Sequence, residues 1–223
     1  MTRILGTVTI GQSPRTDLIP EMRLVMGTTA NVIEAGALDG LTLGQVKGLA
    51  PLPGDYVLIT RMADGTAVKI AEKHILPRMQ EKIDELVRRG ADVVALVCTG
   101  EFPQFHCEKL LVVPQNVLFH AVAAVVPGGG GLGVLLPDAD QIEQGLRRWR
   151  EITPEVRIEA ASPYGRPGDV EEAAHGLRQW GAELVVMDCI GYTLAMKETA
   201  RRVTGVPVIL ARSILARTLA ELA

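Results

Sequence analysis

An eleven-residue segment occurs twice in this chain, and both copies end on Cys-x-Gly. The first is GADVVALVCTG at residues 90–100, and the second is GAELVVMDCIG at residues 181–191. Cys98 therefore aligns with Cys189, 91 residues later along the chain. That offset is too long for a stacked repeat array but suits a small α/β domain. The duplication predicts two similar lobes, each carrying a cysteine at the same place.

The pattern around each copy is that of an α/β fold. Strand-like and helix-like segments alternate along the chain, which is typical of a mostly parallel sheet. Residues 92–97 and 184–187 are continuous apolar runs, as expected of strands that are buried on both faces. A helix is predicted before each run, over residues 72–89 and 170–180. The first helix has one apolar stripe, made of Ile75, Met79, Ile83 and Leu86.

The remaining elements complete two α/β lobes. Strands are predicted over residues 4–10, 32–35, 56–61, 66–70, 132–136, 156–160 and 206–210. Helices are predicted over residues 114–126, 138–150 and 213–222, and after Gly191. Pro127 and the four glycines that follow it form the best linker candidate. Residues 128–133 also fit GxGxxG, but these glycines precede a strand instead of following one, so a flexible connector is favoured over a dinucleotide site.

We therefore predict two pseudo-symmetric, flavodoxin-like α/β lobes with a cleft between them. The N-terminal lobe would span residues 1–130 and the C-terminal lobe residues 131–223, with the last helix able to pack on the first lobe. In parallel sheets, ligands bind beyond the carboxyl ends of the strands. Both cysteines are expected at such ends and would face one cleft.

Composition excludes several classes of function. The net charge is −3 and no basic stripe is interleaved with aromatic residues, so no nucleic-acid partner is expected. No apolar run reaches the roughly 18 residues of a membrane helix. The N-terminus lacks the zones of a signal peptide, which indicates a cytoplasmic protein. Three cysteines without metal-ligand spacing predict neither a disulfide framework nor a metal site.

A pair of cysteines on opposite sides of a cleft suits one chemistry. One thiolate would remove a proton from a carbon beside a carboxylate, and the opposite thiol would return a proton to the other face. No cofactor is needed for this reaction. Gly100 and Gly191 would let the backbone approach a ligand closely. The competing interpretation, that each cysteine is only a packed apolar side chain, is weakened by their shared register, and it is preferred for Cys107.

Other residues at the predicted carboxyl edge leave two interpretations open. The loop Gln12-Ser13-Pro14-Arg15 follows the first strand, and it is either a capped turn, in which Ser13 or Asp17 starts a helix, or an anion site. Residues 211–213 could supply a charge or a hydroxyl, although Ser213 could instead cap the last helix. Asp188 precedes Cys189, where its carboxylate could take the thiol proton or oppose the thiolate.

The segments TIGQSPR, GADVVALVCTG, GAELVVMDCIGY and VPVILARSILARTLAEL are similar to those of AroM-family proteins. The resemblance covers almost the whole chain, and it extends to the aspartate/glutamate racemase superfamily. This superfamily includes amino-acid and hydantoin racemases, maleate isomerase and arylmalonate decarboxylase. The likeness implies two pseudo-symmetric lobes, a cleft cysteine in each, and a homodimer. Racemases usually place Thr or Asn after each cysteine; Thr99 fits that pattern and Ile190 does not.

The resulting hypothesis is a cofactor-independent racemase, isomerase or related lyase that acts on a small carboxylate. Cys98 and Cys189 are the predicted catalytic residues. The predicted substrate-binding residues are Gln12, Ser13, Arg15, Thr99, Gly100, Glu101, Gly191, Tyr192 and Ser213. The alternatives are a non-catalytic protein that binds or senses a small carboxylate, and a redox thiol pair whose sulfurs lie within disulfide reach.

Overall fold

The computed structural model describes residues 3–27, 30–126 and 130–223. The chain forms two compact units. Unit 1 comprises Met1–Gln115 and Ala216–Ala223, and unit 2 comprises Asn116–Leu215. Residues 127–129 of the predicted linker lie outside the described residues. Helix α4 (Pro114–Ala123) and helix α8 (Ala211–Leu222) each contribute residues to both units.

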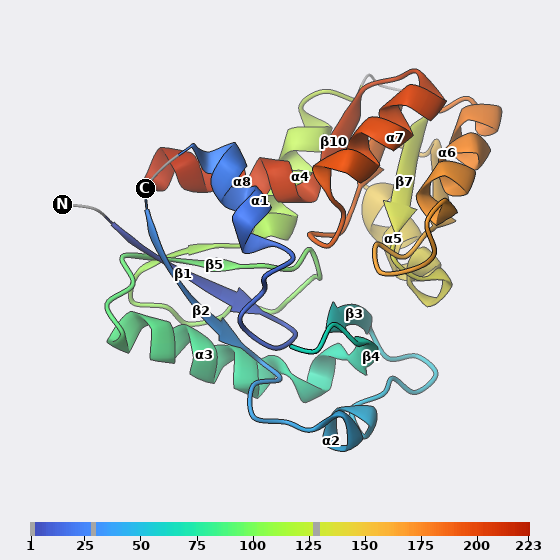
Figure 1. The fold of residues 1–223 in the computed structure, drawn as a ribbon. Coiled ribbons are helices and arrows are strands. Elements are labelled where there is room, and N and C mark those ends of the chain that lie inside the picture. Colours follow the sequence, from blue (N-terminus) through green and yellow to red (C-terminus); the bar gives the residue numbers. More distant parts are fainter. Residues whose placement is uncertain (1–2, 28–29, 127–129) are drawn as a thin grey trace. The chain divides into compact units, whose positions relative to one another are not determined.

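Unit 1 is built on a four-stranded parallel sheet with the order β2-β1-β5-β6. Its strands are β1 (Ile4–Thr9), β2 (Asn31–Gly36), β5 (Val93–Leu96) and β6 (Leu110–Val112). Helix α3 (Leu76–Arg88) lies along one face of this sheet and helix α1 (Ile19–Met26) lies on the other (Figure 1). The buried residues of α3 are Met79, Ile83 and Leu86, which belong to the apolar stripe expected from the sequence.

Three smaller elements extend unit 1 beyond the sheet. Strands β3 (Val57–Arg61) and β4 (Ala67–Ala71) form an antiparallel ribbon. Helix α2 (Leu43–Lys47) starts with a capping box, because Thr42 and Gln45 bond each other's backbone N–H. The 3₁₀ turn η1 (Glu72–His74) leads into α3.

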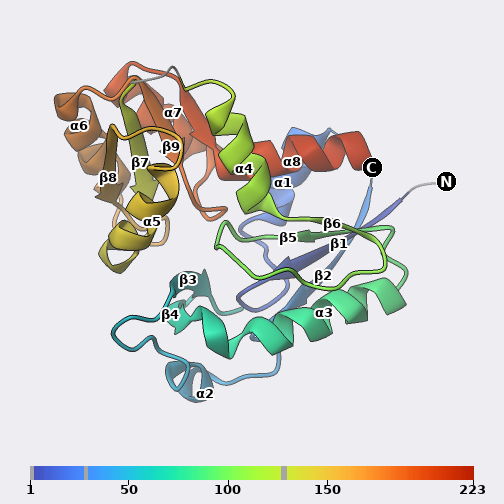
Figure 2. The same ribbon diagram turned by 180° about the vertical axis from the view of Figure 1, so that it is seen from behind.

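Unit 2 repeats the same sheet, with the order β10-β9-β7-β8 and all strands parallel. Its strands are β7 (Leu132–Leu136), β8 (Val156–Ala160), β9 (Leu184–Met187) and β10 (Val208–Leu210). Its helices are the turn η2 (Ala139–Gln141), α5 (Ile142–Trp149), α6 (Asp169–Trp180) and α7 (Leu194–Thr204). Figure 2 shows α4 and α5 on one side of the sheet and α6 and α7 on the other.

The duplication extends to individual atoms of the packing. Gly6 on β1 pairs with Val94, and Gly133 on β7 pairs with Val185. A Cβ on Gly6 would lie 3.1 Å from the Cβ of Ala91, and one on Gly133 would lie 3.0 Å from the Cβ of Ala182. In both units, therefore, the absence of a side chain on the central strand lets the helix that precedes the cysteine strand pack closely.

This packing gives a stability prediction. Gly6→Ala and Gly133→Ala should each destabilise the fold by about 1–3 kcal/mol, because the added methyl overpacks against backbone-anchored neighbours. Gly44→Ala is the matched control, since its Cβ would meet only the hydroxyl of Thr42, at 3.9 Å. The measurement is chemical denaturation of the three variants. Equal stability of all three would contradict the prediction.

Most elements agree with the sequence analysis within one to three residues, and β7, β8 and β9 agree at both ends. The α/β class with two lobes of parallel strands is confirmed. Helix α2 and strand β6 were not predicted. The helix predicted over residues 72–89 is instead a 3₁₀ turn followed by α3, which begins at Leu76 and has Pro77 in its first turn. No helix among the described residues is long and apolar enough to cross a membrane.

Candidate functional site

Both cysteines lie at the carboxyl edge of a parallel sheet. Cys98 comes two residues after β5 ends, and Cys189 comes two residues after β9 ends. The backbone that leads to them is held in the same way, because Val97 N donates to Val8 O at 2.8 Å and Asp188 N donates to Leu135 O at 3.0 Å. Each cysteine thus sits at the edge where ligands bind in parallel sheets.

Each of the two thiols accepts a hydrogen bond from the glycine two residues after it. The backbone N–H of Gly100 donates to Cys98 Sγ at 3.3 Å, and that of Gly191 donates to Cys189 Sγ at 3.3 Å. Both cysteines are half-buried. A hydrogen bond donated to sulfur stabilises the thiolate over the thiol. The Cys-x-Gly motif therefore builds the same thiolate-favouring turn in each unit.

The two glycines are required by close contacts. A Cβ on Gly100 would lie 2.8 Å from Leu58 Cδ2, and a Cβ on Gly191 would lie 2.6 Å from the hydroxyl oxygen of Tyr164. Neither glycine has a positive φ, so space and not backbone conformation selects glycine here. Gly100 and Gly191 shape the turns that carry the N–H donors.

The chain after the two cysteines differs between the units. The helix expected after Cys189 is confirmed as α7, which begins at Leu194 and is capped by Thr193, whose Oγ1 accepts from Met196 N at 3.1 Å. Residues 97–109, all of them described, contain neither helix nor strand. The donor at each thiol is therefore a loop N–H and not the first turn of a helix.

Asp188 is engaged by two side chains from α5. Its Oδ2 accepts from Arg148 Nη2 at 2.7 Å and from Trp149 Nε1 at 2.9 Å, and the carboxylate is fully buried. This ion pair offsets the negative charge that Asp188 would otherwise place next to Cys189. Asp188 therefore anchors the end of β9 to α5, a role the sequence did not indicate because Arg148 lies 40 residues away.

Tyr192 and Ile190 are both buried beside the second thiol. The Tyr192 hydroxyl donates to Ala161 O at 2.6 Å. Burial, followed by the nearby charges of Cys189 and Asp188, raises the pKa of Tyr192 well above its usual value. The phenol thus stays protonated and joins the cysteine loop to the segment that follows β8.

Helix α8 places Arg212 beside the Cys189 turn, and Ser213 follows Arg212 in the chain. Arg212 is 1% exposed, and it donates from Nε to Ile190 O at 2.8 Å and from Nη2 to Gly191 O at 2.9 Å. Ser213 is buried in the first turn of α8, and its Oγ has no hydrogen-bond partner among the described residues. Ser213 is not the N-cap, because α8 begins at Ala211. Sequence reasoning named residues 211–213 only as possible donors and did not single out Arg212.

In unit 1, Ser13 is held by a carboxylate of the chain itself. Asp39 accepts from Ser13 N, Ser13 Oγ and Gly36 N, each at 2.7 Å. The loop after β1 and the loop after β2 are thereby joined. The backbone N–H and the hydroxyl of Ser13 thus bind a carboxylate of unit 1 itself.

Gln12 and Arg15 also make hydrogen bonds within unit 1. Gln12 Nε2 donates to Leu41 O at 2.8 Å, and its Oε1 accepts from Ala63 N at 2.8 Å. Arg15 is buried and donates to both carboxylate oxygens of Asp17 at 2.8 Å. The expectation that Ser13 or Asp17 caps a helix was wrong, because α1 begins at Ile19 after Leu18 without a side-chain cap. Asp17 instead neutralises Arg15.

The Arg15–Asp17 pair makes stability depend on pH. Burial favours protonated Asp17, but the hydrogen bonds and charge of Arg15 outweigh it and lower the pKa of Asp17. The lowered folded-state pKa means that the pair stabilises the fold above the unfolded value of about 3.9 and loses this effect as pH falls through the folded value. Arg15→Met should therefore cost about 1–3 kcal/mol at neutral pH and progressively less below about pH 4. Urea unfolding across a pH series tests this, with exposed Arg23→Met as the control.

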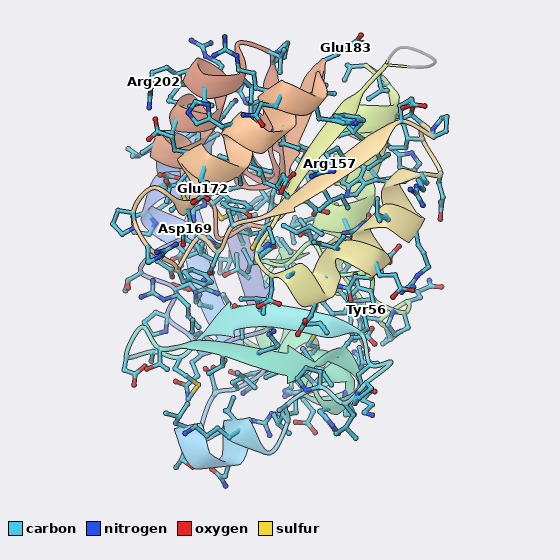
Figure 3. The ribbon with its side chains drawn as sticks, turned by 90° about the vertical axis from the view of Figure 1, so that its right-hand side faces the viewer. Tyr56, Arg157, Asp169, Glu172, Glu183 and Arg202 are labelled. Atoms are coloured by element: carbon cyan, nitrogen blue, oxygen red, sulfur yellow. The ribbon has the colours of Figure 1, made fainter. Side chains whose placement is uncertain are left out.

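Glu101 lies at the exposed end of the Cys98 loop. Its backbone N–H donates to the Tyr56 hydroxyl at 3.1 Å. Tyr56 precedes β3 and is labelled in Figure 3. Partial burial, followed by the charge of Glu101, raises the pKa of Glu72 above its usual value. The Cys98 loop thus rests on the β3–β4 ribbon, and Thr99 is buried within it.

Figure 3 identifies the two ends of unit 2. Asp169, at the start of α6, lies toward the end where the strands finish, and Glu183, just before β9, lies at the opposite end. The loop over residues 162–168 is therefore at the same edge as Cys189. Tyr164 from this loop would meet any side chain at Gly191, as noted above.

The described residues contain no group of three or more His, Cys, Asp or Glu side chains that could hold a metal ion. All three cysteines are described, and none of them forms a disulfide. Unit 1 holds one thiol turn, and unit 2 holds the other together with Arg212.

A family model described as AroM protein matches residues 5–223 of the chain. The chain belongs to the AroM family. The match includes both Cys-x-Gly turns and the loop after β1, so the resemblance found in the sequence is confirmed. Among curated proteins, none matches this AroM-family chain in sequence.

Solved structures of this fold include enzymes of several kinds. Maleate isomerase from Pseudomonas putida S16 superposes with a TM-score of 0.62 at 14% identity, covering 100% of this chain and 92% of its own. Unliganded arylmalonate decarboxylase gives 0.60 at 14% identity, covering 98% and 93%. Glutamate racemase from Aquifex pyrophilus gives 0.58 at 12% identity, covering 99% and 84%. At these identities the likeness establishes the fold alone, which this chain shares with an isomerase, a decarboxylase and a racemase.

Proposed function

We propose that this AroM-family protein is a cofactor-independent racemase, isomerase or related lyase that acts on a small carboxylate. The observation that carries the proposal is the duplicated thiol turn, in which a glycine N–H donates to sulfur at the carboxyl edge of each sheet. A merely packed cysteine does not require the same donor twice. The racemases, isomerases and decarboxylases that share the fold support a reaction at a carbon next to a carboxylate.

In the proposed reaction, one cysteine acts as the base and the other as the acid. The thiolate takes the proton from the carbon beside the carboxylate, and the electron pair of that C–H bond passes into the enolate. The opposite thiol then donates its proton to the other face of the carbon and becomes the thiolate. Matched acid–base catalysis of this kind contributes about 10²–10⁴-fold to the rate.

The substrate carboxylate has its best-supported anchor in unit 2. The Ser213 hydroxyl is buried in the first turn of a twelve-residue helix and lacks a partner among the described residues. The N-terminus of a helix attracts anions through its backbone N–H groups and partial positive charge. Ser213 would donate to the carboxylate, with Thr99 and the two glycine turns around the reacting carbon.

The test is proton exchange in D₂O, followed by NMR on a pool of aspartate, glutamate, malate, hydantoins and aromatic-pathway acids. Loss of one C–H signal that depends on Cys98 and Cys189 would identify the substrate and the reaction. Exchange that persists at the full rate without both thiols would overturn the proposal. Ser213→Ala should raise KM about tenfold if the hydroxyl binds the ground state, with a smaller change in kcat.

A second function is favoured by one observation. Ser13 and Arg15 are already engaged by Asp39 and Asp17, and the side chain of Ile190 cannot form a hydrogen bond beside Cys189. A protein that only binds or senses a small carboxylate would need no complete second half-site. Thermal stabilisation by one acid of the pool, retained when both cysteines are replaced and accompanied by no exchange, would establish this binding function.

A further inference from the structure

Arg212 bonds the peptide group that serves the second thiol. Its Nε donates to the carbonyl oxygen of Ile190, and the N–H of that same peptide group, which belongs to Gly191, donates to Cys189 Sγ. A second donor, Nη2, holds the next carbonyl, that of Gly191. A buried cation on the oxygen of a peptide polarises its N–H and strengthens the hydrogen bond on the other side. Arg212 is thus linked to the sulfur through one peptide.

Unit 1 has a neutral residue at the equivalent position. In unit 1, Ala95 of β5 pairs with Val112 of β6. In unit 2, the residue 91 positions later, Val186, pairs with Ile209. Gln115 lies three residues after Val112, and Arg212 lies three residues after Ile209. Each is the second residue of its helix.

The environment of Gln115 shows the contrast with Arg212. Gln115 is 7% exposed, and its Oε1 has no hydrogen-bond partner among the described residues. The two thiol turns therefore have equivalent N–H donors, whereas the residue at the matching helix position is an arginine in unit 2 and a glutamine in unit 1.

We infer that Arg212 is a positioning residue that fixes and polarises the Ile190–Gly191 peptide, so that Cys189 is the thiolate of the pair at neutral pH and Cys98 the thiol. Asp188 does not reverse this asymmetry, because Arg148 and Trp149 hold its carboxylate. Tyr164, whose hydroxyl approaches Gly191, and Tyr192 are titratable groups of unit 2 beside this turn, and the raised pKa of Tyr192 keeps its phenol neutral. One consequence rests on the proposed function: in that reaction, Cys189 is the base that takes the first proton.

The test compares the two thiols in Cys107→Ala protein, with Cys98→Ala leaving only Cys189 and Cys189→Ala leaving only Cys98. The rate of alkylation by iodoacetamide across a pH series gives the pKa of each remaining thiol without any substrate. We expect the pKa of Cys189 to lie at least about one unit below that of Cys98. At pH values below both pKa values, this difference makes the thiolate fraction of Cys189 about tenfold larger. A lower value for Cys98, or equal values, would overturn the inference.

Arg212→Gln copies the residue of unit 1 and supplies the decisive variant. It should raise the pKa of Cys189 to that of Cys98, and Arg212→Lys should restore part of the difference, since it keeps the charge but not both hydrogen bonds. Gln115→Met is the matched control and should leave Cys189 unchanged. An unchanged Cys189 in Arg212→Gln would contradict the inference. Alkylation needs no turnover, so this result does not depend on whether the proposed function is correct. If an Arg212 variant does not fold, the comparison of the two native thiols still decides the inference.

Discussion

Replacing Cys98 or Cys189 by alanine is expected to lower the rate of substrate C–H exchange by about 10²–10⁴-fold, because each variant removes one partner of the proposed acid–base pair. The glycine N–H at each sulfur stabilises a thiolate, so the loss falls on proton transfer and not on folding. Binding of the substrate, measured by calorimetry, should change much less than kcat. Exchange in D₂O and loss of optical activity are the two readouts.

Cys107→Ala is the matched control for both substitutions. Cys107 is half-buried and packs against the core of unit 1, and it has no counterpart in the repeat. It should retain the full exchange rate. If only one of the two repeat cysteines proves necessary, the reaction is a one-base process such as that of a lyase. Full activity in both variants would contradict the assignment of the pair.

Arg148→Met is expected to destabilise the protein by about 3–5 kcal/mol, the cost of leaving one partner of a buried ion pair without its counter-charge. Arg148 and Asp188 are both buried, and Arg148 Nη2 lies 2.7 Å from Asp188 Oδ2. The adjacent variant Arg147→Met is the control, because Arg147 forms only an exposed pair with Glu143, worth at most about 0.5 kcal/mol. Urea denaturation of both variants measures the difference.

Adding Asp188→Asn to Arg148→Met should recover part of the lost stability, since the double variant no longer buries a lone carboxylate. Arg148→Met by itself also tests the link to the site. Because the carboxylate of Asp188 would then lack its counter-charge next to Cys189, this variant should also slow the alkylation of Cys189. Equal stabilities of Arg147→Met and Arg148→Met would show that the buried pair contributes nothing to the fold.

The sequence predicted the parts of the molecule that follow from local patterns. Local patterns predicted the buried strands β5 and β9, the apolar stripe of α3 and the glycine at the end of each preceding helix. These features could be predicted because burial and helix termination depend on a few neighbouring residues. Duplication added what local patterns lack. Two copies of Cys-x-Gly in register predicted the thiol turns and the lobes around them.

The boundaries that failed have identifiable causes. Helix α1 begins at Ile19 without a side-chain cap, because the carboxylate of Asp17 accepts hydrogen bonds from Arg15 instead. Strand β6 is only three residues long, and Leu110, its first residue, is exposed, so it has no periodic signal. Short elements that tertiary pairing stabilises leave little trace in the amino-acid pattern.

The sequence by itself determined the fold class, the duplicated halves and the two cysteine positions, since each depends on residues close together in the chain or on direct repetition. Only the tertiary structure decided the electrostatics around those cysteines. The carboxylate of Asp188 is compensated from 40 residues away by Arg148, and the Gly191 turn is held by Arg212 from the far end of β10. A hydrogen bond or an ion pair depends on distance in space, and for residues so far apart in the chain that distance is set by how the strands and helices pack.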